Sequence, residues 1–402
     1  MENENLYRRY KDIIILGLIS ALIGIVVGIF DTIFGKVLLY VTSVRESHAA
    51  WLIPFLPIVG VAIVYLYDKF GKNSIKGMSL VFEAGHGEVD EIPVMLIPLV
   101  SVSTWLTHLF GGSAGREGVA IQIGATVANG VGRRIKIVDN EYSMKILLVA
   151  GMAAGFAGLF QTPIAAVFFA VEVLTVGVLE HKALFPTLIA SYASSITSHM
   201  LGLEKFSVNL VDKVNFDWMM VVKLAIIGVV FGVAGGLFAD LLKITKDLFK
   251  RLFENPMKKV LLVGILISVF SLLLHTGRYS GLGTNLIAES FNGKIYSYDF
   301  ILKAIFTVVT LSAGFQGGEV TPLFSIGASL GVLLASLMGL PISFVAALGY
   351  AGVFASATNT LIAPMFIGAE VFGFQYMPYF FVICMLSYIF NGNRTIYSLQ
   401  KK

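Results

Sequence analysis

The stretch from Glu319 to Glu370, EVTPLFSIGASLGVLLASLMGLPISFVAALGYAGVFASATNTLIAPMFIGAE, has no Asp, Glu, Lys or Arg between its two terminal glutamates. This interval of fifty residues is long enough for two or more membrane crossings, because one helical crossing needs about 20 apolar residues. The core of a soluble protein has no use for so long an uncharged segment. The stretch therefore predicts an all-α polytopic membrane protein.

The composition of the whole chain agrees with this interpretation. Of its 402 residues, 56% are hydrophobic and 13% are charged, whereas soluble domains carry about 25% charged residues. The only cysteine, Cys384, excludes a disulfide framework and a cysteine-rich metal cluster. The net charge of +4 gives no reason to expect nucleic acid as a partner. Membrane lipid is the expected surrounding, and we expect neither a cofactor nor a metal site.

Lysine and arginine collect before the first apolar span, in the segments after residues 131 and 242, and at the chain end. The positive-inside rule places these segments in the cytoplasm, so both termini are expected there, in a cell membrane, most simply a prokaryotic inner membrane. The expected divisions are a cytoplasmic N-terminal segment (1–12), a first transmembrane half (13–200), an external linker (201–217), a second transmembrane half (218–390) and a cytoplasmic C-terminal segment (391–402), with no regulatory domain.

The chain resembles itself at a shift of 198 residues. Residues matched in this way are Phe156, Ala157, Thr162, Ile164, Ala165, Phe168, Glu172 and Val173 with Phe354, Ala355, Thr360, Ile362, Ala363, Phe366, Glu370 and Val371. Upstream, Gly115-Arg116-Glu117 resembles Gly318-Glu319, so we expect Glu319 at a position related to that of Glu117. A duplicated transporter places its substrate between the halves, where discontinuous helices hold it.

Glycine-rich breaks precede several apolar helices. The segment Gly111–Gly118 reads GGSAGREG, Gly317–Pro322 reads GGEVTP, and Lys76–Ser79 reads KGMS. Small residues leave backbone amides uncovered, and the first helical turn has donors without an intrahelical partner at the positive end of the dipole. These breaks predict anion sites. The alternative is that the glycines merely allow close helix packing.

Glu117 stands beside these amides inside a span, where an ionisable group is functional by default. Its carboxylate can compete with a transported anion for the amides, and protonation would release it. One side chain then serves as gate and proton carrier; the alternative role is a salt bridge with Arg116. Glu319 is a candidate second proton station. For Glu172 and Glu370, structural roles at helix ends are favoured over proton relay.

Four motifs occur in one order along nearly the whole chain. They are Gly115–Gly118 (GREG), the helix of Glu172 after Gln161-Thr162-Pro163, the stretch Gly317–Pro322, and the closing RTIYS of residues 394–398. In this order they resemble the CLC family of chloride channels and anion/proton antiporters. The resemblance implies a homodimer of inverted-repeat subunits with broken helices and one pore per subunit. It also implies anion ligands from helix N-terminal amides and from a tyrosine, here Tyr397.

Departures from the family pattern point to one branch of it. Met78 stands where a serine is usual, and Val119 follows the gating motif in place of proline. Glu319 replaces a hydrophobic residue and Val320 a phenylalanine, and Val173 stands where ordinary exchangers carry a proton-conducting glutamate. These departures resemble the fluoride-exporting branch. Met78 removes a hydroxyl donor suited to chloride and brings a soft, adaptable side chain.

The resemblance implies a secondary active transporter, not an enzyme, that exports fluoride in exchange for protons. The gating and proton-transfer residues are then Glu117 and Glu319. The expected anion-binding residues are Gly77, Met78, Gly115, Arg116, Gly118, Val320, Thr321 and Tyr397, with Phe82 and Phe315 as weaker candidates that present electropositive ring edges.

Two alternatives remain at this point. Within transport, the chain could be a chloride/proton exchanger or a passive anion channel, with chloride as substrate. Among enzymes, Gly111–Gly115 satisfies the Gly-x-Ser-x-Gly pattern of a nucleophile elbow, which would make Ser113 the nucleophile of an intramembrane serine hydrolase. That elbow needs a preceding strand and a histidine within reach, and His108 lies close in the sequence.

Overall fold

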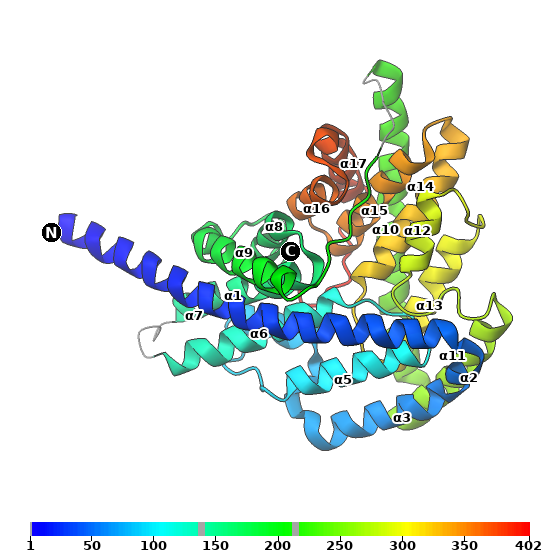
Figure 1. The fold of residues 1–402 in the computed structure, drawn as a ribbon, viewed down its shortest axis with the longest axis horizontal. Coiled ribbons are helices and arrows are strands. Elements are labelled where there is room, and N and C mark those ends of the chain that lie inside the picture. Colours follow the sequence, from blue (N-terminus) through cyan, green and yellow to red (C-terminus); the bar gives the residue numbers. More distant parts are fainter. Residues whose placement is uncertain (1, 136–140, 211–216) are drawn as a thin grey trace.

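The computed structural model describes residues 2–135, 141–210 and 217–402, and it builds this part of the chain from helices. In chain order the α-helices are α1 (Glu2–Ser47), α2 (Ala49–Leu52), α3 (Leu56–Leu66), α4 (Met78–Gly85), α5 (Leu96–Leu109), α6 (Glu117–Arg134), α7 (Glu141–Phe160), α8 (Pro163–Glu172), α9 (Leu184–Met200), α10 (Trp218–Leu252), α11 (Pro256–Leu273), α12 (Thr284–Phe291), α13 (Asp299–Ala313), α14 (Val320–Met338), α15 (Ile342–Thr358), α16 (Ile362–Phe372) and α17 (Met377–Ile389). Figure 1 shows α1 as a long helix that runs across the molecule.

Six helical segments among the described residues are long and apolar enough to cross a membrane, and several shorter apolar helices accompany them. The prediction of an all-α polytopic membrane protein is therefore confirmed. Helix α1 already begins at Glu2, so the expected division at residue 12 coincides with no change of secondary structure. Of the expected linker 201–217, residues 211–216 lie outside the described part of the chain.

Glycine and proline shorten several of the apolar segments into partial helices. The apolar run 146–179 contains Pro163, which predicts an interruption, and it forms α7 and α8 with a break at Gln161-Thr162. Pro163 occupies the first turn of α8, where its missing N–H leaves no partner unsatisfied and where it cannot continue α7. Gln161 adopts a left-handed φ of 61° at this break.

The two halves of the chain pack as a related pair. Helix α6 packs on α7, and α14 packs on α15. At both contacts the backbones approach so closely that a Cβ on Gly124 or Gly327 would overlap a carbonyl of the facing helix. Between the halves, α8 packs on α16, and the rings of Phe168 and Phe366, which the repeat matches, stack with centroids 4.7 Å apart. These paired contacts agree with a duplicated unit.

Glu172 on α8 and Glu370 on α16 each cap the N-terminus of the helix that carries the other. The carboxylate of Glu172, at the end of α8, accepts hydrogen bonds from the amides of Ile362 and Ala363 at the start of α16. The carboxylate of Glu370 accepts from Ile164 and Ala165 at the start of α8 in the same way. A carboxylate stabilises a helix N-terminus by bonding its free amides and by opposing the dipole. These contacts fit the structural role at helix ends.

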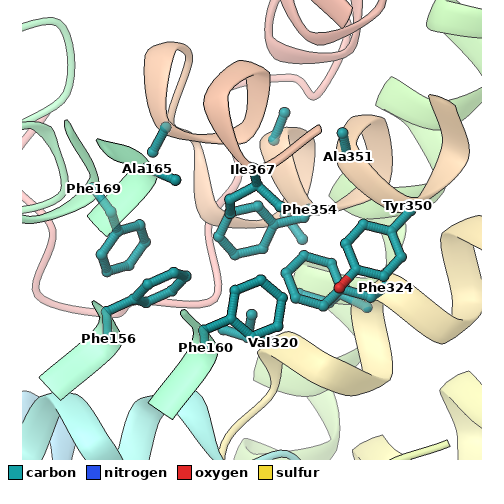
Figure 2. Close-up of a cluster of buried hydrophobic side chains, with 14 of the residues drawn as sticks. Phe156, Phe160, Ala165, Phe169, Val320, Phe324, Tyr350, Ala351, Phe354 and Ile367 are labelled. Carbon is teal, nitrogen blue, oxygen red and sulfur yellow. The ribbon is translucent and has the colours of Figure 1, made fainter. Parts of the chain in front are cut away.

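Aromatic rings from both halves form the buried core between the two sets of helices. Figure 2 shows Phe156, Phe160 and Phe169 of the first half facing Phe324 and Phe354 of the second. Phe160 stacks on Phe324 with ring centroids 5.3 Å apart, and Phe156 stacks on Phe169 at 5.2 Å. This packing holds the start of α14 against the end of α7.

The segment after α17 folds back into the molecule. The amide of Lys401 donates to the carbonyl of Leu174, and the amide of Val176 donates to the carbonyl of Lys401. The side-chain amide of Gln400 donates to the carbonyls of Val173 and Thr358. These bonds anchor the end of the chain beside α8 and place Tyr397 inside the protein, where it is 5% exposed.

Candidate functional site

Three helices begin at the predicted glycine-rich breaks. Helix α4 begins at Met78, α6 at Glu117 and α14 at Val320. Gly77 precedes α4 with a φ of +53°, a left-handed conformation that glycine adopts without strain. The predicted Gly77, Met78, Glu117, Val320 and Thr321 thus lie at or beside free helix amides.

Glu117 is fully buried and reaches from α6 to the beginning of α14. The hydroxyl of Thr321 lies 2.6 Å from both carboxylate oxygens, and the amide of Thr321 donates to Oε2 at 3.1 Å. The carboxylate therefore occupies the N-terminal amide position of a helix from the opposite half of the chain. Such a position suits any small anion.

Arg116 makes weaker contacts with the same carboxylate. Its backbone amide donates to Oε2 of Glu117 at 3.2 Å, and its Nε lies 3.7 Å from Oε1 without a hydrogen bond. The salt bridge considered as an alternative role is thus present at long range. Thr321 makes the shorter contacts, so the repeat-related helix holds Glu117 more closely than its sequence neighbour does.

Gly115 and Gly318 bring the two breaks together. The amide of Gly318 donates to the carbonyl of Gly115 at 2.8 Å, and the amide of Gly115 donates to the carbonyl of Gly318. A Cβ on Gly115 would lie 3.0 Å from the carbonyl oxygen of Gly318, so the close approach requires glycine. Gly118 lies on the same contact, 3.5 Å from Gly318 when its Cβ is added.

This pairing corrects the expected relation between the two glutamates. With Gly115 opposite Gly318, the next residues, Arg116 and Glu319, each occupy the N-cap position of the following helix without a capping bond from the side chain. Glu319 is therefore the counterpart of Arg116, and Glu117 corresponds to Val320. The alignment from the sequence was wrong by one residue. Gly318-Glu319 can be matched to Gly115-Arg116-Glu117 only if Arg116 is skipped.

A cavity of about 400 Å³ brings together the other predicted residues. Glu319 lines it from the start of α14, where the side chain is half-buried. The predicted residues Gly77, Met78, Phe82, Phe315 and Tyr397 line the cavity as well. The predicted Gly115, Arg116, Glu117, Gly118, Val320 and Thr321 are absent from its lining. The predicted set thus divides into a buried gate cluster around Glu117 and Thr321 and an open cavity beside Glu319.

Tyr397 stands between the cavity and the gate cluster. Its ring lies 5.2 Å from that of Phe82, and its buried hydroxyl has no hydrogen-bond partner among the described residues. Both Glu117 and Glu319 are close enough to act on it electrostatically. A free O–H donor at this point can bind a small anion that enters from the cavity.

The cavity lining also contains polar residues that the sequence analysis did not select, among them Gln122, Lys246 and Lys259. Gln122 donates to the carbonyl of Gly118 and leaves its own side-chain oxygen without a partner. Lys246 and Lys259 bring positive charge, and Lys246 is close enough to act on Glu319. Gln122 could have been noticed as a polar residue in an apolar helix. The two lysines appeared in the sequence only as part of a basic segment between spans.

Ser113 is held by α13. Its hydroxyl lies 2.9 Å from Thr307 Oγ1, and it accepts a hydrogen bond at 2.9 Å from the ammonium group of Lys303. Lys303 is fully buried and also donates to the carbonyls of Tyr279 and Gly281. These bonds attach the segment before Glu117 to the second half of the chain.

The same contacts argue against a nucleophile elbow. Helix α5 precedes Ser113 where the elbow needs a strand, and Ser113 is fully buried. Neither ring nitrogen of His108 has a hydrogen-bond partner within the described residues, so His108 does not activate the Ser113 hydroxyl. Ser113 is therefore a structural residue of the segment that carries Glu117.

The chain is similar to known membrane transport proteins over most of its length. The family described as "Voltage gated chloride channel" matches residues 59–392. A protein of Pseudomonas syringae pv. tomato named "Chloride/fluoride channel protein" is 34% identical over 95% of this chain and 85% of its own length.

Solved structures agree with this relationship. The crystal structure of a CLC-type fluoride/proton antiporter is 54% identical, with a TM-score of 0.94 over 96% of this chain and 97% of its own. A slow cyanobacterial Cl⁻/H⁺ antiporter, at 20% identity, has a TM-score of 0.81 over 95% of this chain and 96% of its own, which shows a shared fold.

Proposed function

The chain belongs to the voltage-gated chloride channel family, and from this premise we propose that it is a secondary active transporter that exports fluoride in exchange for protons. The observation that carries the proposal is the position of Glu117. Its fully buried carboxylate bonds the amide and hydroxyl of Thr321 at the start of α14, where a transported anion would find the same donors.

Protonation of Glu117 changes what these donors can hold. A neutral carboxyl group loses its attraction to the helix N-terminus, so the side chain leaves and an anion takes its place beside Thr321. When the proton is released, the carboxylate returns and displaces the anion. Because proton and anion occupy the gate in turn, movement of one is coupled to movement of the other.

The cavity beside Glu319 supplies the approach to this gate. Lys246 and Lys259 concentrate anions there by their charge. The free hydroxyl of Tyr397 offers the next donor, and Met78 and Phe82 narrow the passage with apolar surface. In the proposal, Glu319 is the second proton-transfer residue. The gate and cavity residues, namely Gly77, Met78, Gly115, Arg116, Gly118, Val320, Thr321, Tyr397, Phe82 and Phe315, form the anion path.

Fluoride is favoured as the substrate over chloride by two observations. Met78 stands at the start of α4 and adds no hydroxyl donor, and Glu319 places a carboxylate in the path, which penalises a large anion that needs room. The similarity to a fluoride/proton antiporter extends to 54% identity, against 20% for a chloride/proton antiporter of the same fold. The alternative is a chloride/proton exchanger or passive anion channel.

The remaining assignments follow from the family as proposals. We place the protein in a cell membrane, as a prokaryotic inner-membrane homodimer surrounded by lipid, with both termini in the cytoplasm. No hydrolytic activity is expected, since Ser113 is buried and held by Lys303 and Thr307.

Purified protein in liposomes tests the proposal. An outward fluoride gradient should drive proton uptake, measured with an internal pH dye alongside a fluoride electrode, while an equal chloride gradient should drive little. Met78→Ser should raise chloride flux relative to fluoride, and Met78→Leu is the matched control that adds no hydroxyl. Chloride flux as fast as fluoride flux in the unmodified protein would overturn the fluoride assignment, and fluoride flux without proton movement would overturn exchange.

A further inference from the structure

A buried carboxylate away from the anion path is not used by the proposed transport mechanism. Asp31 lies in the membrane-spanning part of α1, Lys11–Ser47, and is fully buried. Neither of its two carboxylate oxygens has a hydrogen-bond partner among the described residues. Asp31 lines neither the cavity beside Glu319 nor the gate cluster. A buried polar group without a partner calls for a physical explanation.

Asp31 faces a hydroxyl group that also lacks a partner. Helix α1 packs on α9 and α7 at this level. A Cβ placed on Gly158 of α7 would overlap both Oδ2 of Asp31 and Oγ of Ser194 on α9, so the two oxygens converge on one point above Gly158. The hydroxyl of Ser194 is fully buried and unpartnered. The absence of a side chain at Gly158 makes room for the pair.

The surface that α9 presents here is polar rather than apolar. Its buried residues include Thr187, Ser191, Ser194, Ser195 and Ser198, which recur along one face of the helix. Beside them, Gln161 exchanges hydrogen bonds with Ser195. Small hydroxyl residues also serve close helix packing in membranes, so the hydroxyl face alone assigns nothing. Asp31, a fully buried carboxylate aimed at that face, is the second observation.

No positive charge among the described residues compensates Asp31, since none of them forms a hydrogen bond with its carboxylate. Lys36, on the same helix, points to the exposed side. The helices packed on α1 are α2, α5, α6, α7 and α9. The described titratable side chains on them are His108, Glu117, Arg133, Arg134, Tyr142, Lys145, Tyr192 and His199, and none of them forms a hydrogen bond with Asp31.

An ionised carboxylate in this place would be a single unpaired charge inside the membrane, which is strongly unfavourable. A bound metal cation is disfavoured, because hard cations collect about six oxygen ligands and one carboxylate with one hydroxyl supplies few. A bound proton removes both difficulties, the unpaired charge and the missing hydrogen-bond partner. It neutralises the charge and turns one carboxylate oxygen into a donor for the Ser194 hydroxyl.

We propose that Asp31 is a proton-binding site of this protein, in which a protonated carboxyl group shares its proton with the hydroxyl of Ser194 between α1 and α9. The site is separate from Glu117 and Glu319 and does not depend on which anion is transported. Loss of the proton at alkaline pH leaves a negative charge between α1 and α9, so the packing of these two helices responds to pH.

Infrared spectroscopy of protein labelled with ¹³C-aspartate tests the site directly, because the label separates aspartate from the buried glutamates. At neutral pH the unmodified protein should show the carbonyl stretch of a protonated aspartic acid, and Asp31→Asn should remove it. Ser194→Ala should keep the band and shift its frequency, because the hydrogen bond is lost. Asp240→Asn is the matched control, since Asp240 is exposed and paired with Arg394.

Thermal unfolding in detergent gives an independent measurement. If the folded chain holds one proton that the unfolded chain releases, stability falls as the pH rises. The melting temperature of the unmodified protein should therefore decline between neutral and alkaline pH more steeply than that of Asp31→Asn. Absence of the labelled band at neutral pH would overturn the proposal. So would stabilisation by sodium or lithium ions that Asp31→Asn removes, because a cation would then occupy the site.

Discussion

The starts of α6 and α14 are built on one plan and carry different side chains at matched positions. Gly115 and Gly318 pair across the contact, and the next residues are Arg116 in one half and Glu319 in the other. The following position holds Glu117 in α6 and Val320 in α14. In the proposed mechanism, α6 therefore provides the carboxylate that moves, and α14 provides the helix amides that receive it.

This difference explains how the two halves of a duplicated chain can contribute different groups to one gate. If both helices began with a glutamate, two carboxylates would compete for each other's amides and repel. With Val320 in place of a second glutamate, only the amide and hydroxyl of Thr321 face Glu117. Glu319 is displaced by one residue into the cavity, within reach of Lys246. In the proposed mechanism the two glutamates therefore have different places, Glu117 in the buried gate cluster and Glu319 at the open cavity.

The largest effect is expected from Glu117→Gln, which removes the movable charge from α6 and leaves the size of the side chain unchanged. A glutamine cannot release a proton, so fluoride-driven proton uptake into liposomes should vanish, while fluoride flux itself persists. The matched control is Glu88→Gln, an exposed carboxylate far from the gate. Proton uptake that survives in Glu117→Gln would show that another group carries the proton.

Thr321→Val tests the receiving side of the comparison. The hydroxyl of Thr321 donates to the carboxylate of Glu117, and a hydrogen bond to a charged group contributes about 1.5–3 kcal/mol. The Glu117 carboxylate should therefore bind at the start of α14 about tenfold to a hundredfold more weakly, and more fluoride should pass per proton. Thr321→Ser keeps the hydroxyl and should retain the exchange ratio. An unchanged ratio in Thr321→Val would assign the hold on Glu117 to backbone amides alone.

The smallest of the three effects is expected from Glu319→Ala, because this residue lines the open cavity and does not bond the gate. Turnover should fall by about tenfold, roughly 1.4 kcal/mol in the barrier, as the second proton-transfer group is lost. Glu319→Gln separates charge from volume. A normal turnover rate in both variants would reduce Glu319 to a structural residue at the N-cap position of α14 and would make the two helix starts equivalent apart from Glu117.

Much of this arrangement was accessible to sequence reasoning, because it depends on local chemistry. The breaks before α4, α6 and α14 were predicted from glycine and proline positions, and helices begin at all three. The structural roles of Glu172 and Glu370 fit the caps that they form. The apolar run 146–179 divides at Pro163, as the proline predicts, but the left-handed backbone conformation of Gln161 at this break could not be read from the apolar composition.

Other features could not be predicted from the sequence, because they depend on which distant segments meet in the folded chain. The alignment of Glu319 with Glu117 was wrong by one residue, and only the pairing of Gly115 with Gly318 corrects it. Lys303 and Asp31 are both charged residues inside apolar spans, a signal that was present in the sequence and went unused. Their different situations could not be read from the sequence: Lys303 donates to three acceptors, whereas Asp31 has no hydrogen-bond partner among the described residues.

The sequence by itself determined the membrane class, the duplication and the places where helices break. These follow from the length of apolar runs and from the conformational freedom of glycine and proline, which act locally. The tertiary structure alone decided that Glu117 meets Thr321, that Glu319 faces a cavity and that Asp31 faces Ser194. Those partners lie far apart along the chain, and a buried ionisable group takes its properties from the groups that folding brings around it.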